Sequence, residues 1–144
     1  MKYTTLKAFA FVGLLLVLAA ASVPAQTRNT IKVNIPFDFA VGDARLKAGQ
    51  YLIDRVDITR LVVTSEDGKA RVLTLAPRPV ERTRGHASEK LVFHRYGDMY
   101  FLSEAWIDGS GNGLYPSKAE RSAARELAKA NGKPDTTEIV ARVK

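Results

Sequence analysis

The chain has 144 residues, a formal net charge of +7 and no cysteine. That length suits one domain, because domains commonly contain roughly 100–150 residues. The missing cysteine excludes disulfides, thiolate zinc sites, a cysteine nucleophile and the lipoprotein class, whose leader is cut at a cysteine.

The first 25 residues have the layout of a cleavable signal peptide. A basic start is followed by an uninterrupted apolar stretch over residues 8–21, and Val23-Pro24-Ala25 places small or slender residues before a cut at Gln26. The apolar stretch is shorter than the roughly 18 residues that a membrane-spanning helix needs; an uncleaved N-terminal anchor is the alternative. The sequence therefore predicts a signal peptide (1–25) and one domain (26–144) exported to the periplasm or the medium.

Removal of this leader, which holds two lysines and no acidic residue, leaves 20 basic and 15 acidic residues. Such an excess favours loose association with anionic surfaces such as lipid headgroups, lipopolysaccharide or acidic polysaccharide. The simpler interpretation is that the charge keeps the protein soluble.

Hydrophobic alternation predicts the first strands. Residues 31–41 alternate strictly between apolar and intervening positions, which is typical of a half-buried strand. Pro36 lacks an amide hydrogen, so this strand is expected at a sheet edge or with a bulge. Gly49 can then turn the chain before an extended segment that restarts at Tyr51.

Two hairpins follow. Residues 60–65 and 70–76 flank an Asp-Gly turn, and residues 90–96 and 99–107 flank Gly97-Asp98. The start of the last strand is apolar on both faces, which predicts a central position in a sheet. Two loops are predicted at Pro77–Glu89 and Asp108–Tyr115.

One helix is predicted over about residues 117–131. Ser117 can accept a hydrogen bond from the amide of Glu120 while the Glu120 side chain reaches back, and Gly132 suits a left-handed end. The expected inward stripe is Ala119, Ala123, Leu127 and Ala130. Because this stripe buries little apolar area, the helix is expected at the periphery. Residues 137–143 alternate again and predict a last short strand.

Six or seven short strands separated by turns predict a mostly β fold, either a small β-sandwich or an open barrel, with one C-terminal helix.

Several motifs carry a resemblance. They are Ile35-Pro36-Phe37-x-Phe39-x-Val41-Gly42, Leu46-x-Ala48-Gly49-x-Tyr51, and Arg95-Tyr96-Gly97-Asp98-x-Tyr100-Phe101-Leu102 with Trp106. Together they resemble a family of small exported bacterial proteins that has no assigned activity. Lys47 departs from the family, which usually has proline there. The resemblance implies a secreted, mostly β domain and transfers no catalytic residue.

The sequence offers weak signals for catalysis. His94 neighbours Arg95 and Asp98 around a tight turn, and a histidine beside a carboxylate could act as a general base. No serine stands in a Gly-x-Ser-x-Gly setting, so a surface position on the hairpin is the favoured interpretation.

Metal binding is equally weakly indicated. Asp54 with Asp57, or the segment 108–112, could offer oxygen ligands, but that segment lacks the closing glutamate of a calcium loop. A glycine-rich turn is the favoured interpretation, and we assign no catalytic residue, metal ligand or cofactor.

Two groups of side chains are candidates for binding. The first is a row of basic residues along one helical face: Lys118, Arg121, Arg125 and Lys129. The second is a late group of aromatic residues: Tyr96, Tyr100, Trp106 and Tyr115. A solvated helix face for the first group and ordinary core packing for the second are the favoured interpretations, with binding as the alternative.

The leading hypothesis is a non-enzymatic exported β domain that binds a partner or associates with the envelope, the partner being an anionic envelope component or polysaccharide. One alternative is a hydrolase of an extracellular polymer that uses Asp98, Glu104 and Asp108. Another is a structural subunit that pairs through exposed sheet edges. No specific nucleic-acid motif is present.

Overall fold

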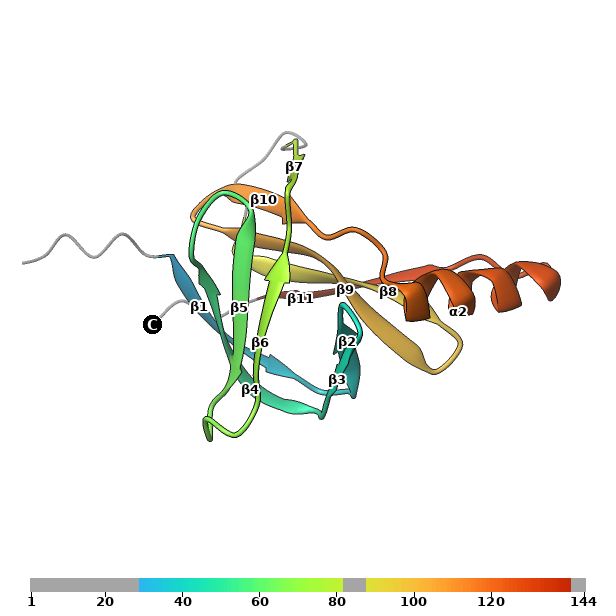
Figure 1. Cartoon of the computed structure of the whole chain (residues 1–144), viewed down its shortest axis with the longest axis horizontal. Helices are drawn as coiled ribbons and strands as arrows, with labels where there is room; N and C mark the ends of the chain where they lie inside the picture. The colour runs from blue at the N-terminus through green and yellow to red at the C-terminus, as the bar shows by residue number, and fades with distance from the viewer. Residues whose placement is uncertain (1–28, 82–87, 141–144) are drawn as a thin grey trace, which may run out of the picture.

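The structure is a computed structural model that describes residues 29–81 and 88–140. The described part consists of two β-sheets and one helix (Figure 1). The strands are β1 (Thr30–Ile35), β2 (Phe39–Val41), β3 (Ala44–Leu46), β4 (Gly49–Arg55), β5 (Arg60–Ser65), β6 (Arg71–Leu75), β7 (Arg78–Val80), β8 (Lys90–Tyr96), β9 (Met99–Ile107), β10 (Ser110–Gly113) and β11 (Asp135–Val140). The helix α2 spans Lys118–Lys129.

The first sheet has the strand order β1-β4-β5-β6, and the second has the order β11-β8-β9-β10-β7. In the second sheet β2 adds to β9 in parallel, and β3 pairs with β2. The expectation of a mostly β sandwich with one C-terminal helix is confirmed, but the described residues form eleven strands rather than six or seven. The predicted signal peptide lies outside the described residues.

The strand expected over residues 31–41 is two strands. β1 pairs with β4 in the first sheet, whereas β2 pairs with β9 in the second. The chain therefore crosses between sheets at Pro36–Asp38, where a residue without an amide hydrogen costs no ladder bond. The expected edge position of β1 is confirmed.

Both predicted hairpins are confirmed as antiparallel pairs, β5 with β6 and β8 with β9. The two predicted loops each contain a strand, β7 and β10, which the sequence analysis missed. Both glycines of β10, Gly111 and Gly113, lie where neighbouring side chains occupy the space that a Cβ would need. A Cβ on Gly111 would lie 2.9 Å from the Trp106 ring, and one on Gly113 would lie 2.8 Å from Arg78 Nε.

The core lies between the two sheets. Phe93 on β8 is fully buried at its centre and meets Phe37 and Phe39 edge to face, with centroid distances of 5.3 and 5.6 Å. Asn112 is buried in β10, and its amide donates to the carbonyl of Ile58, 2.8 Å away, near the β4–β5 turn. The buried members of this cluster come from the inner faces of both sheets and include Ile31, Val33, Ile53, Leu61, Val63, Leu91, Leu102 and Ile107.

Helix α2 packs on the outer face of the second sheet. Ala123, Tyr96, Phe101 and Ala40 form a second buried cluster, with Leu127 packed against it. The expected stripe is partly wrong: Ala119 and Ala130 are exposed. The inward positions that replace them are Glu120, which is buried, and Ala124, which is partly buried.

The ends of α2 also differ from expectation. Ser117 Oγ accepts from the Glu120 amide at 3.1 Å, as predicted, but the Glu120 side chain does not complete a capping box. Asn131, at φ 53°, takes the left-handed position assigned to Gly132. A Cβ on Gly132 would lie 2.5 Å from Leu127 Cδ1, so the glycine is needed for space.

The predicted last strand is observed as β11, which pairs with β8. Its expected continuation over residues 141–143 lies outside the described residues.

At the other edge of the first sheet, β6 presents Leu73 and Leu75, which are 62% and 64% exposed. Among the described residues, no helix is long and apolar enough to cross a lipid bilayer.

Candidate functional site

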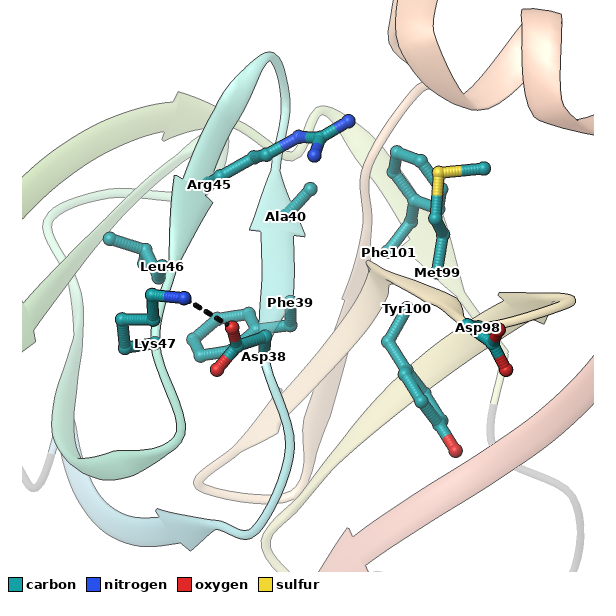
Figure 2. Close-up of a pocket in the computed structure, with 10 residues that line it drawn as sticks. All are labelled: Asp38, Phe39, Ala40, Arg45, Leu46, Lys47, Asp98, Met99, Tyr100 and Phe101. Atoms are coloured by element: carbon teal, nitrogen blue, oxygen red, sulfur yellow. Dashed lines mark hydrogen bonds and ion pairs between the residues drawn. The ribbon is translucent and has the colours of Figure 1, made fainter.

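Two parts of the chain that are far apart in the sequence, the β2–β3 hairpin and the start of β9, meet around a hollow (Figure 2). The hollow has a volume of about 200 Å³ and is lined by residues 38–40, 45–47 and 98–101. We call it the hairpin cleft. These segments overlap the three motifs that carry the sequence resemblance.

The parallel pairing of β2 with β9 forms the floor of the hairpin cleft. It sets Phe39 opposite Tyr100 and Ala40 opposite Phe101. Tyr100 stacks on Phe37 with a centroid distance of 3.9 Å and an interplanar angle of 15°. This stacking holds the Tyr100 ring in place, while Phe39 and Phe101 are buried.

An ion pair fixes one wall of the hairpin cleft. Lys47 Nζ donates to Asp38 Oδ2 at 2.7 Å, and the Ala48 amide donates to Asp38 Oδ1 at 2.9 Å (Figure 2). The Lys47 hydrogen bond and then the Ala48 amide hold the pKa of Asp38 below its usual value, and the same carboxylate raises the pKa of Lys47. Tyr51 Oη donates to the Lys47 carbonyl at 2.7 Å and secures the turn from beneath.

Arg45 on β3 differs from the other cations nearby. Lys47 is paired with Asp38, Lys69 with Asp67 and Lys32 with Glu66. The Arg45 side chain makes no hydrogen bond or ion pair within the described part of the chain. It lines the hairpin cleft and two further hollows, one toward β4 and the β5–β6 turn and one along α2. An unpaired guanidinium thus stands where three hollows meet.

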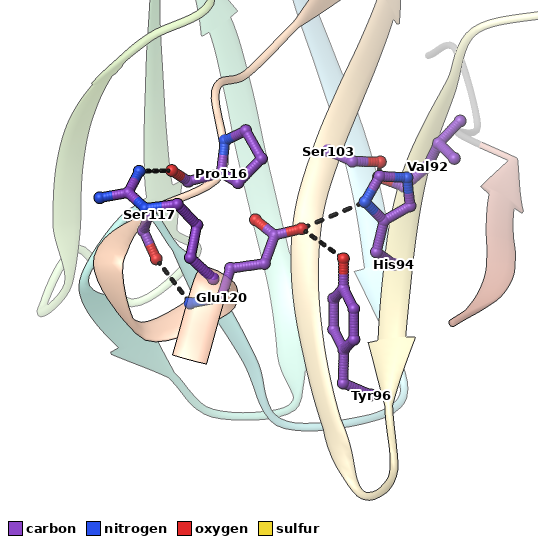
Figure 3. A network of polar contacts seen from close by, with 8 residues as sticks. Val92, His94, Tyr96, Ser103, Pro116, Ser117 and Glu120 are labelled. Atoms are coloured by element: carbon purple, nitrogen blue, oxygen red, sulfur yellow. Dashed lines mark hydrogen bonds and ion pairs between the residues drawn. The ribbon is translucent and has the colours of Figure 1, made fainter. Parts of the chain in front are cut away.

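A polar network joins α2 to the second sheet (Figure 3). Glu120 Oε1 lies 3.1 Å from His94 Nδ1 and accepts from Tyr96 Oη at 3.2 Å. The carboxylate in contact with His94 is that of Glu120, not that of Asp98, its neighbour in the sequence. The network therefore positions the helix.

Burial, and then the nearby Glu120 carboxylate, raise the pKa of Tyr96 above its usual value of about 10. The unfolded chain ionises its tyrosines at the usual pKa. The contribution of Tyr96 to stability is therefore complete below about pH 10 and is lost as the pH rises through the alkaline range. We expect Tyr96→Phe to flatten the alkaline decline of stability, measured by urea unfolding between pH 8 and 11. An unchanged decline in this variant would contradict the assignment.

The aromatic residues singled out from the sequence do not form one surface. Tyr96 is buried beneath α2, Tyr100 lines the hairpin cleft, and Tyr115 is exposed. Trp106 is buried over Gly111 at the other end of β9, and its Nε1 donates to Glu104 Oε2 at 3.0 Å. These four residues therefore do not share one groove. Of the four, only Tyr100 lines the hairpin cleft.

The four basic residues lie together, as predicted, on the face of α2 opposite the sheet. Lys118, Arg121, Arg125 and Lys129 are all exposed. Within the described residues only Lys129 has an ion-pair partner, Glu126 at 2.8 Å. Arg121 and Arg125 donate to the carbonyls of Pro116 and Arg121, which leaves their charge uncompensated. We call these four residues the basic face.

The carboxylates considered for hydrolysis are separated. Asp98 precedes the first residue of β9 and Asp108 follows its last, so roughly 30 Å of strand lies between them. Glu104 is engaged by Trp106 on the outer face. A pair of acting carboxylates needs a separation of about 5–9.5 Å, which Asp98 and Asp108 do not have.

The candidate metal ligands are likewise engaged elsewhere. Asp54 accepts from Thr30, and Asp57 accepts from Thr59 and Arg60. The segment 108–112 forms the turn into β10. No group of three or more acidic or histidine side chains able to hold a metal occurs in residues 29–81 and 88–140.

Sequence reasoning missed the role of Arg45 and of the Glu120 network. The available signal for Glu120 was an acidic residue at an otherwise apolar helix position. No pattern in the sequence identified Arg45. Only the folded structure shows that, among the described residues, no carboxylate pairs with its side chain.

Comparisons with protein-family profiles, with curated proteins and with solved structures found no match.

Proposed function

We propose that this protein is an exported, non-enzymatic β domain of a bacterial cell envelope that binds an acidic polysaccharide. The observation that carries the proposal is the basic face, where three cations without an acidic partner lie in one row on an exposed helix. Such a row attracts a polyanion through long-range electrostatics that salt screens. The leader-like segment 1–25 and the resemblance to an exported family support the location.

The chemistry of the basic face favours a polysaccharide over a lipid surface. Helices that bind bilayers insert large apolar side chains next to their cations. Leu127, the only large apolar residue of α2, packs toward the sheet, and the basic face contains none. The partner is therefore expected to be negatively charged and to lack a hydrocarbon layer.

Binding is tested with protein purified from the exported fraction of cells that express the full chain. N-terminal sequencing is expected to find Gln26 first; retention in the cytoplasm would contradict the location. We expect the protein to bind immobilised polygalacturonate, to lose that binding as NaCl rises, and to ignore neutral dextran. Phosphatidylglycerol vesicles form the competing arm, and binding to vesicles alone would replace the polysaccharide with a membrane.

Charge reversal locates the binding surface. We expect Arg121→Glu with Arg125→Glu to weaken polygalacturonate binding by roughly tenfold or more, because each exposed pair is worth about 0.2–1 kcal/mol and reversal adds repulsion. The matched control is Arg71→Glu with Arg78→Glu, which changes net charge equally at exposed positions on β6 and β7. Equal losses in both variants would show that net charge alone governs binding.

Pairing through sheet edges is the other candidate. The observation that favours it is β6, an edge strand with two exposed leucines and no proline. Native mass spectrometry distinguishes the two proposals, since edge pairing predicts a dimer in the absence of polysaccharide.

A further inference from the structure

We infer that the hairpin cleft binds one acidic sugar unit of the polysaccharide, with Arg45 as the residue that holds its carboxylate. This inference rests on the proposed function and assigns a ligand class to a site that the basic face does not include. It starts from the contrast between Arg45 and the lysines around it, whose charges are compensated by neighbouring carboxylates. Because a planar guanidinium binds a carboxylate with two parallel hydrogen bonds, the unpaired Arg45 suits that group.

The size of the hairpin cleft limits what it can hold. At about 200 Å³ it is smaller than the roughly 300–1,000 Å³ typical of pockets for drug-sized molecules. A single sugar ring suits this space, whereas a folded polymer or a lipid chain does not.

The lining of the hairpin cleft matches a hydroxylated ring better than a simple anion. Asp98 makes no hydrogen bond with any described residue and can accept only from donors such as sugar hydroxyls. Lys47 can donate on the opposite wall, and Met99, on the same side of β9 as Arg45, offers apolar contact to the C–H groups of a ring (Figure 2). The Asp98 carboxylate would repel an inorganic phosphate more strongly than a sugar unit, because the sugar carries a single carboxylate and several hydroxyls that can donate to Asp98.

The site has an exit toward the basic face. Arg45 and Met99 line both the hairpin cleft and the hollow that continues along α2 past Ser122 and Glu126. Ser122 lies one residue beyond Arg121 on the same helix, so a chain leaving the cleft passes beside the basic face. The cleft would hold one unit and the basic face would attract the units that follow.

The test is a titration of the exported protein with trigalacturonate, followed by ¹⁵N–¹H NMR. We expect saturable shifts of the amides of residues 45–47 and 98–101, and no such shifts with inorganic phosphate or with neutral maltotriose. Arg45 is exposed, and its replacement in Arg45→Gln is expected to weaken trigalacturonate binding at least tenfold. Arg78→Gln is the matched control, because Arg78 is an exposed arginine beside the opposite end of β9, and it should change affinity less than twofold.

Three results would overturn the inference. They are equal affinity of Arg45→Gln and the natural protein, shifts located away from the hairpin cleft, and equal shifts with maltotriose. If Arg45→Gln has no effect while reversal of the basic face still abolishes polygalacturonate binding, the cleft assignment fails and the proposed function stands. If no acidic polysaccharide binds, both fail.

Discussion

Replacement of Phe93 by alanine is expected to lower the free energy of unfolding by about 3–5 kcal/mol, among the largest effects of any single truncation in the domain. Phe93 is fully buried, and its ring meets Phe37 and Phe39 edge to face where the two sheets pack. Truncation removes both aromatic contacts and leaves a cavity that rigid strands cannot close. For a domain of this size the melting temperature should fall by roughly 12–20 °C.

Phe93→Leu is the control for this prediction. Leucine keeps most of the apolar volume, so its cost should be clearly smaller than that of alanine. Thermal unfolding followed by circular dichroism measures both variants. A loss under 1 kcal/mol for alanine would show that the sheets do not pack on Phe93 as described.

Replacement of Glu120 by alanine is expected to cost about 1–3 kcal/mol through two groups that it leaves behind. Tyr96 Oη and His94 Nδ1 both bond to the same carboxylate oxygen, and Tyr96 is buried. Without that acceptor, α2 loses its polar connection to the sheet. Relative to the natural protein, the backbone amides of residues 121–129 should then exchange faster with solvent, and this increase should exceed that of the amides of β4 and β5.

Glu126→Ala is the matched control, since Glu126 lies on the same helix, is exposed and pairs only with Lys129. Its cost should stay below about 0.5 kcal/mol. Hydrogen exchange with mass spectrometry separates local undocking of α2 from global unfolding. Similar exchange in both variants would contradict the positioning role of Glu120.

The sequence was informative wherever a local pattern determined the structure. Alternation located β1, and turn residues between apolar runs located the β5–β6 and β8–β9 hairpins because the backbone chemistry of a turn is local. Ser117 marked the start of α2 for the same reason. The mostly β fold follows from these elements.

The errors have a common physical cause, which is tertiary contact. Gly111 and Gly113 are typical of a loop, yet they lie in β10. Glycine suits these positions because the Trp106 and Arg78 side chains occupy the space above them. The break after Ile35 reflects pairing with two different sheets, which alternation in one strand cannot reveal. Glu120 read as a capping residue because its partners, His94 and Tyr96, are distant in sequence.

The candidate site was predictable only in part. The basic face was foreseen because helical spacing is periodic, and its exposure is confirmed. The aromatic residues do not form one surface because Tyr96 lies beneath α2, Tyr115 follows β10, and Tyr100 and Trp106 lie toward opposite ends of β9. The hairpin cleft requires the parallel pairing of β2 with β9, a long-range contact with no local signal.

Hydrogen exchange of the exported protein with and without polygalacturonate tests the central claim most directly. If one acidic chain occupies both surfaces, protection should appear at residues 45–47, 97–101 and 118–129 and should be absent at β6. Dextran should protect none of these segments. Protection confined to β6, or equal protection by dextran, would contradict the claim that an acidic polysaccharide binds at the hairpin cleft and the basic face.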